Sequence, residues 1–184
     1  MLKKLLPLIL LILIGCSDKS VKNEPIVKNE PIVKNEPIVK NGPYVIYNSE
    51  GVREEGTYLN GKKHGKGTYY YKNGNVYVGD YKDDYINGNG SFYDIEGDKY
   101  IGEYLNNMSH GKGTYHFKSG SKYSGDFIKG KFEGKGTYDY LPSGDKYVGD
   151  WSNDRKHGKG TYYFESGSKY SGDWLNDKSN GEGI

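Results

Sequence analysis

A period of 23 or 24 residues constrains the fold of this chain more than any other feature of its sequence. A tyrosine followed two residues later by a glycine recurs at that interval: Tyr77 and Gly79, Tyr100 and Gly102, Tyr123 and Gly125, Tyr147 and Gly149, and Tyr170 and Gly172. A Gly-x-Gly motif keeps step with it, starting at Gly65, Gly88, Gly111, Gly134, Gly158 and Gly181. Two signatures in phase over six copies indicate a repeat protein, whose units pack mainly against their neighbours.

Each period predicts one β-hairpin and its connection. Tyrosine, phenylalanine, tryptophan, valine and threonine favour strands, whereas the clusters of Asn, Gly, Asp and Ser between them favour turns. Alternation along a strand places Tyr77, Gly79 and Tyr81 on one face, and Val78 and Asp80 on the other. We expect aromatic rings of neighbouring strands to lie over the glycines, because such packing offsets the weakness of glycine in a strand.

Composition supports a sheet built on aromatic rings. The repeats hold nearly all of the 20 tyrosines and 28 glycines, and the chain has no alanine. Such a composition cannot form a conventional aliphatic core, but it can cover one face of a sheet with rings.

The phased motif resembles the MORN (membrane occupation and recognition nexus) repeat, and the segment from Gly149 to Tyr162 matches it especially well. The resemblance covers roughly residues 54–184 and implies an all-β fold: an elongated, single-layer antiparallel sheet of about six consecutive hairpins. The first copy departs from the motif, because Glu54 replaces its leading tyrosine; with the residues before it, it resembles a shorter bacterial variant that serves as a cap. The last copy stops at Ile184, which leaves open a natural half-repeat or a truncation.

The first fifteen residues predict an export signal. Lys3 and Lys4 precede an apolar run, Leu5 to Ile14, which is too short for a membrane span of roughly 20 residues but fits a signal peptide. The run ends in Gly15-Cys16, which resembles the bacterial lipobox, where the cysteine is diacylated with chains such as palmitate. An ordinary signal peptide with a chance cysteine is the alternative.

These features predict a lipoprotein of the bacterial cell envelope, with signal peptide 1–15 and lipidation at Cys16. Ser17, which follows the cysteine, favours the outer over the inner membrane by resemblance to known sorting rules. The sequence Val-Lys-Asn-Glu-Pro-Ile, first at residues 21–26, then recurs, so we expect residues 16–43 to form a solvated linker and residues 44–184 to form the repeat domain.

Charge argues against a nucleic-acid partner. The chain has 26 basic and 24 acidic residues, a formal charge of +2, and removal of Lys3 and Lys4 with the signal leaves 24 of each, or zero. A nucleic-acid binder would be expected to carry a marked basic excess.

No arrangement of residues predicts catalysis. His64, His110 and His157 recur in alternate repeats, four strands and therefore about 19 Å apart, so they cannot share a metal ion. The motif that starts at Gly65 lacks the spacing and the following helix of a phosphate loop. We therefore expect no metal, no cofactor, no small-molecule substrate and no enzymatic activity.

Charged residues instead predict a ladder of ion pairs across the polar face. One row contains Asp80, Glu103, Asp126, Asp150 and Asp173, and the facing row contains Lys66, Lys112, Lys135 and Lys159. Such exposed cross-strand pairs contribute about 0.2–1 kcal/mol each.

Three functions remain open. A membrane-tethered scaffold that binds a partner protein, or its own copies, fits the repeat architecture and the absence of catalytic groups. Phospholipid headgroup binding and cell-wall glycan binding are the alternatives. Only Lys62-Lys63 and Arg155-Lys156, expected at loop tips, are locally basic enough to favour an anionic headgroup.

Overall fold

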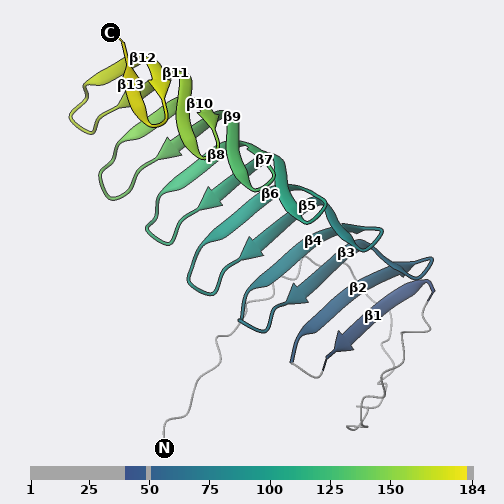
Figure 1. Cartoon of the computed structure of the whole chain (residues 1–184). Helices are drawn as coiled ribbons and strands as arrows, with labels where there is room; N and C mark the ends of the chain where they lie inside the picture. Colours follow the sequence, from purple (N-terminus) through teal and green to yellow (C-terminus); the bar gives the residue numbers. More distant parts are fainter. Residues whose placement is uncertain (1–39, 49–50, 182–184) are drawn as a thin grey trace, which may run out of the picture. The chain divides into compact units, whose positions relative to one another are not determined.

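The computed structural model describes residues 40–48 and 51–181, and within these ranges it contains thirteen β-strands and no helix. The strands are β1 (Gly42–Tyr47), β2 (Arg53–Leu59), β3 (Lys62–Tyr70), β4 (Val76–Lys82), β5 (Tyr85–Tyr93), β6 (Lys99–Leu105), β7 (Met108–His116), β8 (Lys122–Ile128), β9 (Lys131–Asp139), β10 (Lys146–Ser152), β11 (Arg155–Tyr163), β12 (Lys169–Leu175) and β13 (Lys178–Asn180). They form one open antiparallel sheet in which each strand pairs with its neighbours in sequence (Figure 1). The predicted all-β, single-layer fold is confirmed.

The predicted signal peptide, the lipidation site Cys16 and the linker up to residue 39 lie outside the described residues. Strand β1 begins at Gly42, within the range 16–43 expected for the linker, and it includes Pro43. This strand lies at the edge of the sheet, where a residue without an N–H group is tolerated. Among the residues that the structure describes, no helix is long and apolar enough to span a membrane.

Each hairpin closes through a two-residue turn whose geometry follows from its sequence. Between β4 and β5, Asp83 and Asp84 have φ angles of 51° and 72°. A turn with positive φ at both central residues matches the right-handed twist of the flanking strands, and Asn, Asp and Gly adopt it most readily. The equivalent turns are Asn60-Gly61, Asn106-Asn107, Lys129-Gly130, Asn153-Asp154 and Asn176-Asp177.

These turns also connect one repeat to the next. The backbone N–H of Asp154 donates to the carbonyl oxygen of Phe132 at 3.1 Å, and the N–H of Phe132 donates back to Oδ1 of Asp154 at 2.8 Å. Asn107 forms the same pair of bonds with Ile86, and Asp177 forms it with Lys156. The second turn residue therefore links its hairpin to the second strand of the preceding hairpin.

Glycines face one another across the sheet from β3 to β12. Gly149 pairs with Gly136 on β9 and with Gly160 on β11, and the register shifts by a β-bulge between Gly149 and Asp150. The same pairing and shift recur in the other complete repeats. Because the row of glycines carries no side chains, it leaves room directly above the backbone.

A tyrosine ring fills that room. Tyr123 is 0% exposed, and a Cβ atom added to Gly125 would lie only 2.5 Å from its hydroxyl oxygen and 2.6 Å from the Cα of Gly136. The hydroxyl donates to the carbonyl oxygen of Asp126 at 3.0 Å, which is freed by the bulge. Tyr77, Tyr100, Tyr147 and Tyr170 occupy the same position in their repeats and make the same hydrogen bond to the third residue along the strand.

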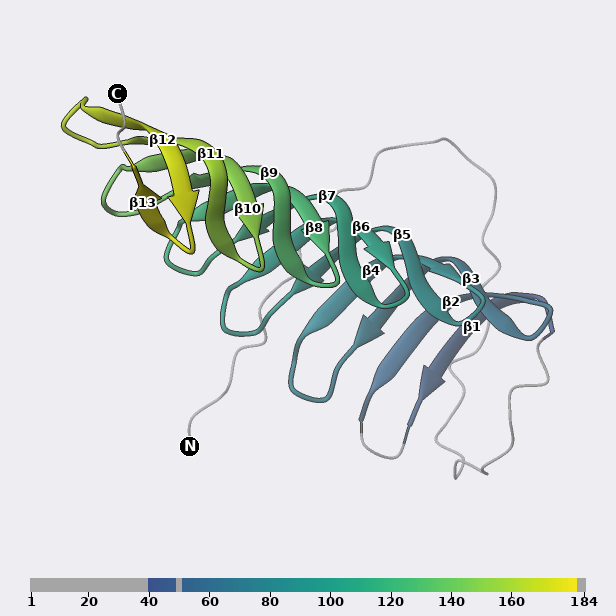
Figure 2. The same cartoon turned by 45° about the horizontal axis from the view of Figure 1, so that its top comes forward.

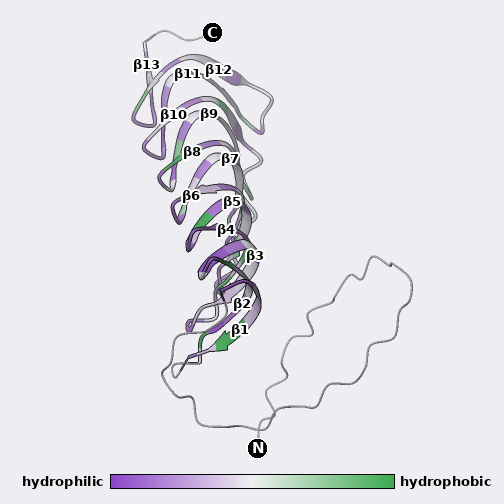
Figure 3. Cartoon of the chain, turned by 90° about the vertical axis from the view of Figure 1, so that its right-hand side faces the viewer, coloured by the Kyte–Doolittle hydropathy of each residue, from purple (hydrophilic) through white to green (hydrophobic). Residues whose placement is uncertain are grey.

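The strands are strongly curved, as Figures 2 and 3 show. Phe117 follows the end of β7, whereas Phe132 lies near the opposite end of the hairpin, level with Phe127. About six residues of extended strand, roughly 20 Å, separate those two levels. The ring centroids of Phe117 and Phe132 are nevertheless 6.4 Å apart, so the two ends of the strands approach each other over the face.

We predict that Tyr123→Ala destabilises the protein by about 3–5 kcal/mol, because it removes a fully buried ring and its hydrogen bond. Tyr163→Ala is the matched control, since that ring is 44% exposed and its loss should cost less than about 1 kcal/mol. Chemical denaturation measures both free energies of unfolding. Equal losses for the two variants would show that Tyr123 is not a core residue.

Candidate functional site: the aromatic trough and the polar face

The concave face of the sheet is lined almost entirely by aromatic rings, and we call it the aromatic trough. Its buried residues are Tyr77, Tyr81, Ile86, Tyr100, Tyr123, Phe127, Tyr147, Trp151 and Trp174. Partly buried rings pack against them: Tyr69, Phe92, Tyr104, Tyr115, Phe117, Phe132, Tyr138, Tyr140, Tyr162 and Tyr170. The trough is thus both the core of the sheet and a surface that presents ring edges to solvent.

The rings in the trough meet mainly edge to face. Tyr123 lies 5.2 Å from Phe127 and 5.2 Å from Trp151, at interplanar angles of 85° and 84°. This geometry aligns the positive edge of one ring with the negative face of the next and contributes about 0.5–1.5 kcal/mol per pair beyond area burial. Because each tyrosine also contacts a ring of the following repeat, the network runs along the trough and couples neighbouring repeats.

One residue per repeat projects into the trough from near the start of the second strand, and we call these the slot residues. They lie nine residues after the buried tyrosine position: Lys63, Ile86, Ser109, Phe132, Lys156 and Ser179. Phe132 stacks on Tyr123, with ring centroids 3.7 Å apart and an interplanar angle of 9°. The slot residue therefore covers the exposed side of the ring that covers the glycines.

Lys156 is one of the residues predicted to lie at a basic loop tip, and this prediction is wrong. Its Nζ atom lies in the trough, 4.7 Å from the ring centroid of Trp174 and 4.8 Å from that of Tyr162, with Tyr140 and Tyr147 within 5.7 Å. Burial lowers the pKa of Lys156, and the nearby carboxylates of Asp177 and Asp145 act in the opposite direction. The ammonium group of Lys156 therefore makes cation–π contacts with four aromatic rings.

The prediction of a basic loop tip is also wrong for Lys63, whose side chain lies in the trough. Its Nζ lies 2.7 Å from Oε1 of Glu54 and within 5.8 Å of the ring centroids of Tyr69 and Tyr81. Glu54 stands at the position of the buried tyrosine, is 7% exposed, and accepts a hydrogen bond of 2.9 Å from the hydroxyl of Tyr44. The glutamate thus provides a charge partner where other repeats provide a ring. The sequence shows this substitution, but local sequence does not predict the pairing of the glutamate with a lysine nine residues later.

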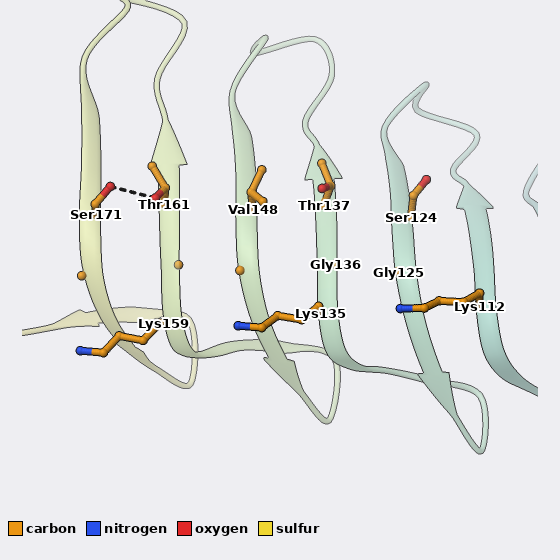
Figure 4. A pocket seen from close by; sticks show the side chains of 13 residues that line it. Lys112, Ser124, Gly125, Lys135, Gly136, Thr137, Val148, Lys159, Thr161 and Ser171 are labelled. Carbon is orange, nitrogen blue, oxygen red and sulfur yellow. Dashed lines mark hydrogen bonds between the residues drawn. The ribbon is translucent and has the colours of Figure 1, made fainter.

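The opposite face is polar and carries the predicted ladder of ion pairs, which is confirmed. The pairs are Lys66–Asp80 at 2.6 Å, Lys112–Asp126 at 2.5 Å, Lys135–Asp150 at 2.5 Å and Lys159–Asp173 at 2.7 Å. Figure 4 shows three of the lysines extended in one direction along a shallow depression that serine, threonine and valine also line. Their ammonium groups are therefore engaged by carboxylates rather than presented free to an anion.

The acidic row has a second role at the bulges. Oδ2 of Asp126 accepts a hydrogen bond of 2.9 Å from the backbone N–H of Lys135. Burial would raise the pKa of Asp126, but the hydrogen bonds from Lys112 and from this N–H outweigh it and lower the pKa. Glu103 makes the same backbone contact with Lys112 but faces Asn89 rather than a lysine. The row thus consists of structural carboxylates, each of which has at least one donor from its own sheet.

The three periodic histidines lie far from one another. His64 is on β3, His110 on β7 and His157 on β11, four strands apart in each case. Within residues 40–48 and 51–181, no group of three His, Cys, Asp or Glu side chains is arranged to hold a metal ion. The described side chains also include no buried polar atom without a hydrogen-bond partner.

Comparison with known families agrees with this architecture. The MORN repeat family matches six segments of the sequence: 55–76, 77–99, 100–122, 123–141, 147–169 and 170–184. Together they cover more than half of the chain, which therefore belongs to the MORN repeat family. No curated protein matches the chain.

Two solved structures are among those to which the chain is similar. One is the TCP domain of SAS-4 (dCPAP) of Drosophila Melanogaster in complex with a proline-rich motif of Ana2 (dSTIL), with a TM-score of 0.40, 17% identity, and coverage of 80% of this chain and 85% of that chain. The other is the wild-type TCP10 domain of Danio rerio CPAP in complex with a peptide of Danio rerio STIL, with a TM-score of 0.20, 12% identity, and coverage of 76% and 83%. Neither likeness bears on what this chain binds.

Proposed function

We propose that this chain is a non-enzymatic MORN repeat scaffold of the bacterial cell envelope, which binds a partner protein through the aromatic trough. The observation that carries the proposal is the row of partly exposed rings along the concave face, fixed in position by the buried tyrosines beneath them. Rigid aromatic side chains contribute a large contact area at little entropic cost, and they are enriched in protein interfaces. The trough is thus organised for binding before a partner arrives.

The charge arrangement favours a protein over a phospholipid headgroup. Four lysines of the polar face are paired with aspartates, and Lys63 and Lys156 are held inside the trough. A surface that binds anionic lipid would present unpaired basic side chains together. Glycan binding by stacked rings is the second alternative, and self-association along the sheet edges is the third.

Lipid attachment at Cys16 would tether the scaffold to a membrane. Two or three acyl chains anchor a protein stably, whereas one chain gives only marginal binding. The signal-like segment before Cys16 and the Val-Lys-Asn-Glu-Pro-Ile repeats after it support this proposal, with the outer membrane favoured by Ser17. In this arrangement the repeats are held at a distance from the bilayer.

Crosslinking in intact cells with the full chain as bait tests the binding face. Tyr71 and Phe164 are 37% and 44% exposed and pack against rings of the trough, so the double variant Tyr71→Asp, Phe164→Asp should lower recovery of a specific partner by about tenfold or more. The matched control is Ile101→Asp, Val148→Asp, which changes side chains of 40% and 41% exposure on the polar face.

The control should retain the partner. Loss of the partner from both variants, or from neither, would contradict the assignment of binding to the trough. Recovery of the chain alone, or of cell-wall material alone, would replace the proposal with self-association or glycan binding.

We further predict that Cys16→Ser abolishes lipidation, because serine lacks the thiol to which the acyl-bearing group is attached. Metabolic labelling with a radioactive fatty acid should mark the parent and leave the variant unlabelled, and the variant should move out of the membrane fraction. A variant that fractionates with membranes as the parent does would show that Cys16 is not the anchor.

A further inference from the structure

The slot residue changes from repeat to repeat, and in one repeat it leaves the slot open. Four slot residues fill the space above the group beneath them, which is a ring in three repeats and the carboxylate of Glu54 in the first. They are Lys63, Ile86, Phe132 and Lys156. Ser109 does not reach that space. The turn residue of the following repeat is also small there, because Gly130 stands where the equivalent turns have Asp154 and Asp177.

A cavity of about 260 Å³ results. Its walls include Phe92, Tyr100, Tyr104, Tyr115 and Phe127, and Ser109 and Gly130 lie at its edge. One repeat further along, the counterparts of these five rings are Tyr115, Tyr123, Phe127, Tyr138 and Trp151, all of which lie within 6.5 Å of the ring of Phe132. The cavity is therefore the site that Phe132 occupies in its own repeat, left open by a serine.

The slot of Lys156 shows how the same rings hold a cation. Lys156 Nζ lies among four rings, with the centroids of Trp174 and Tyr162 closest at 4.7 and 4.8 Å and those of Tyr140 and Tyr147 at 5.6 and 5.7 Å. The counterparts of Tyr147, Tyr162 and Trp174 two repeats earlier are Tyr100, Tyr115 and Phe127, which line the open slot. Three aromatic faces at about 5–6 Å are sufficient for a cation–π site.

A carboxylate beside a slot determines whether a cation or an uncharged side chain fits into that slot. Asp145 lies two residues before Tyr147, accepts a hydrogen bond of 2.7 Å from the Tyr162 hydroxyl, and acts on Lys156. At the open slot, Asp98 lies two residues before Tyr100 and accepts a hydrogen bond of 2.6 Å from the Tyr115 hydroxyl.

The two slots that an uncharged side chain fills, those of Ile86 and Phe132, have no carboxylate at this position. Asn75 holds it in the repeat of Ile86, and Ser121 holds it in the repeat of Phe132. Asp94 adds a second carboxylate that acts on Tyr115, at the position of Phe117 and Tyr140 in later repeats. The hydroxyl of Tyr115 and the backbone N–H of Lys118 lower the pKa of Asp98, so its carboxylate stays ionised at neutral pH.

We propose that the open slot over Tyr100 binds a lysine side chain presented by a partner protein, with the ammonium group held between Tyr100, Tyr115 and Phe127 and facing Asp98. This rests on the proposed protein-binding function and specifies its anchor. In the slot over Tyr100, the partner's lysine occupies the position that Lys156 occupies in the slot over Tyr147. Four other slots are filled by Lys63, Ile86, Phe132 and Lys156, which limits the registers in which a partner's lysine can dock along the trough.

The test is an NMR titration of the ¹⁵N-labelled full chain with a charged and an uncharged probe, Nα-acetyl-lysine N-methylamide and Nα-acetyl-norleucine N-methylamide. The lysine probe should produce saturable shifts at the amides of Asn107, Ser109 and Gly130, with a dissociation constant on the order of 1 mM, because a single side chain offers few contacts. The norleucine probe should bind about fivefold more weakly, since it lacks the charge.

Asp98→Asn keeps an acceptor for the Tyr115 hydroxyl and should weaken the lysine probe about fivefold, without affecting the norleucine probe. The matched control Asp145→Asn should leave both unchanged, because its slot is already filled by Lys156. Ser109→Lys should abolish the shifts by closing the slot from within. Equal binding of the two probes, an Asp98→Asn variant that binds lysine as the parent does, or shifts that do not saturate would each overturn the proposal.

The crosslinking experiment in intact cells separates the proposed lysine anchor from the more general proposal that a partner protein binds in the trough. A partner that is lost with the Tyr71→Asp, Phe164→Asp variant but retained by Asp98→Asn would reject the lysine anchor and keep the binding face. A partner retained by both variants would reject binding in the trough altogether.

Discussion

The packing of a tyrosine ring on a pair of facing glycines is the interaction on which the rest of this sheet depends. The ring needs the space that two absent side chains leave, and its hydroxyl needs the carbonyl oxygen that the following bulge releases. A Cβ atom at either glycine would enter the ring, and a smaller residue in place of the tyrosine would leave the glycines uncovered. Tyrosine and glycine therefore recur together in every complete repeat.

The curvature and the binding surface follow from this packing. Strands that bend over their own rings bring the two ends of each hairpin together, so residues from opposite turns line one trough. Because the buried tyrosine is fixed, the slot residue nine positions later can vary without loss of the fold. A lysine, an isoleucine, a phenylalanine and a serine all occupy this position. Such variation allows one repeat to differ from its neighbours in what it binds.

The architecture was predictable because a period of 23 residues and strict alternation leave few other folds, and the rows of acidic residues and lysines followed from the same alternation. The roles of Lys63 and Lys156 were not predictable from local sequence. Their neighbours in sequence are charged or glycine, which is typical of a loop tip, whereas the rings that hold them come from residues up to 18 positions away, as with Trp174. Only the curvature of the strands brings these rings together. The open slot at Ser109 is not predictable from local sequence for the same reason.

The most direct test of the account compares alanine at two aligned glycines. Gly125 lies under the ring of Tyr123, with the nearest atoms 2.5–2.6 Å from an added Cβ, whereas Gly56 belongs to the first repeat, where Glu54 replaces the tyrosine and the nearest atoms are 3.1–3.2 Å away. The free energy of unfolding should fall by about 3 kcal/mol or more for Gly125→Ala and by about 1 kcal/mol or less for Gly56→Ala. Similar losses at the two positions would show that the packing of the ring on the glycines does not determine the stability of the sheet.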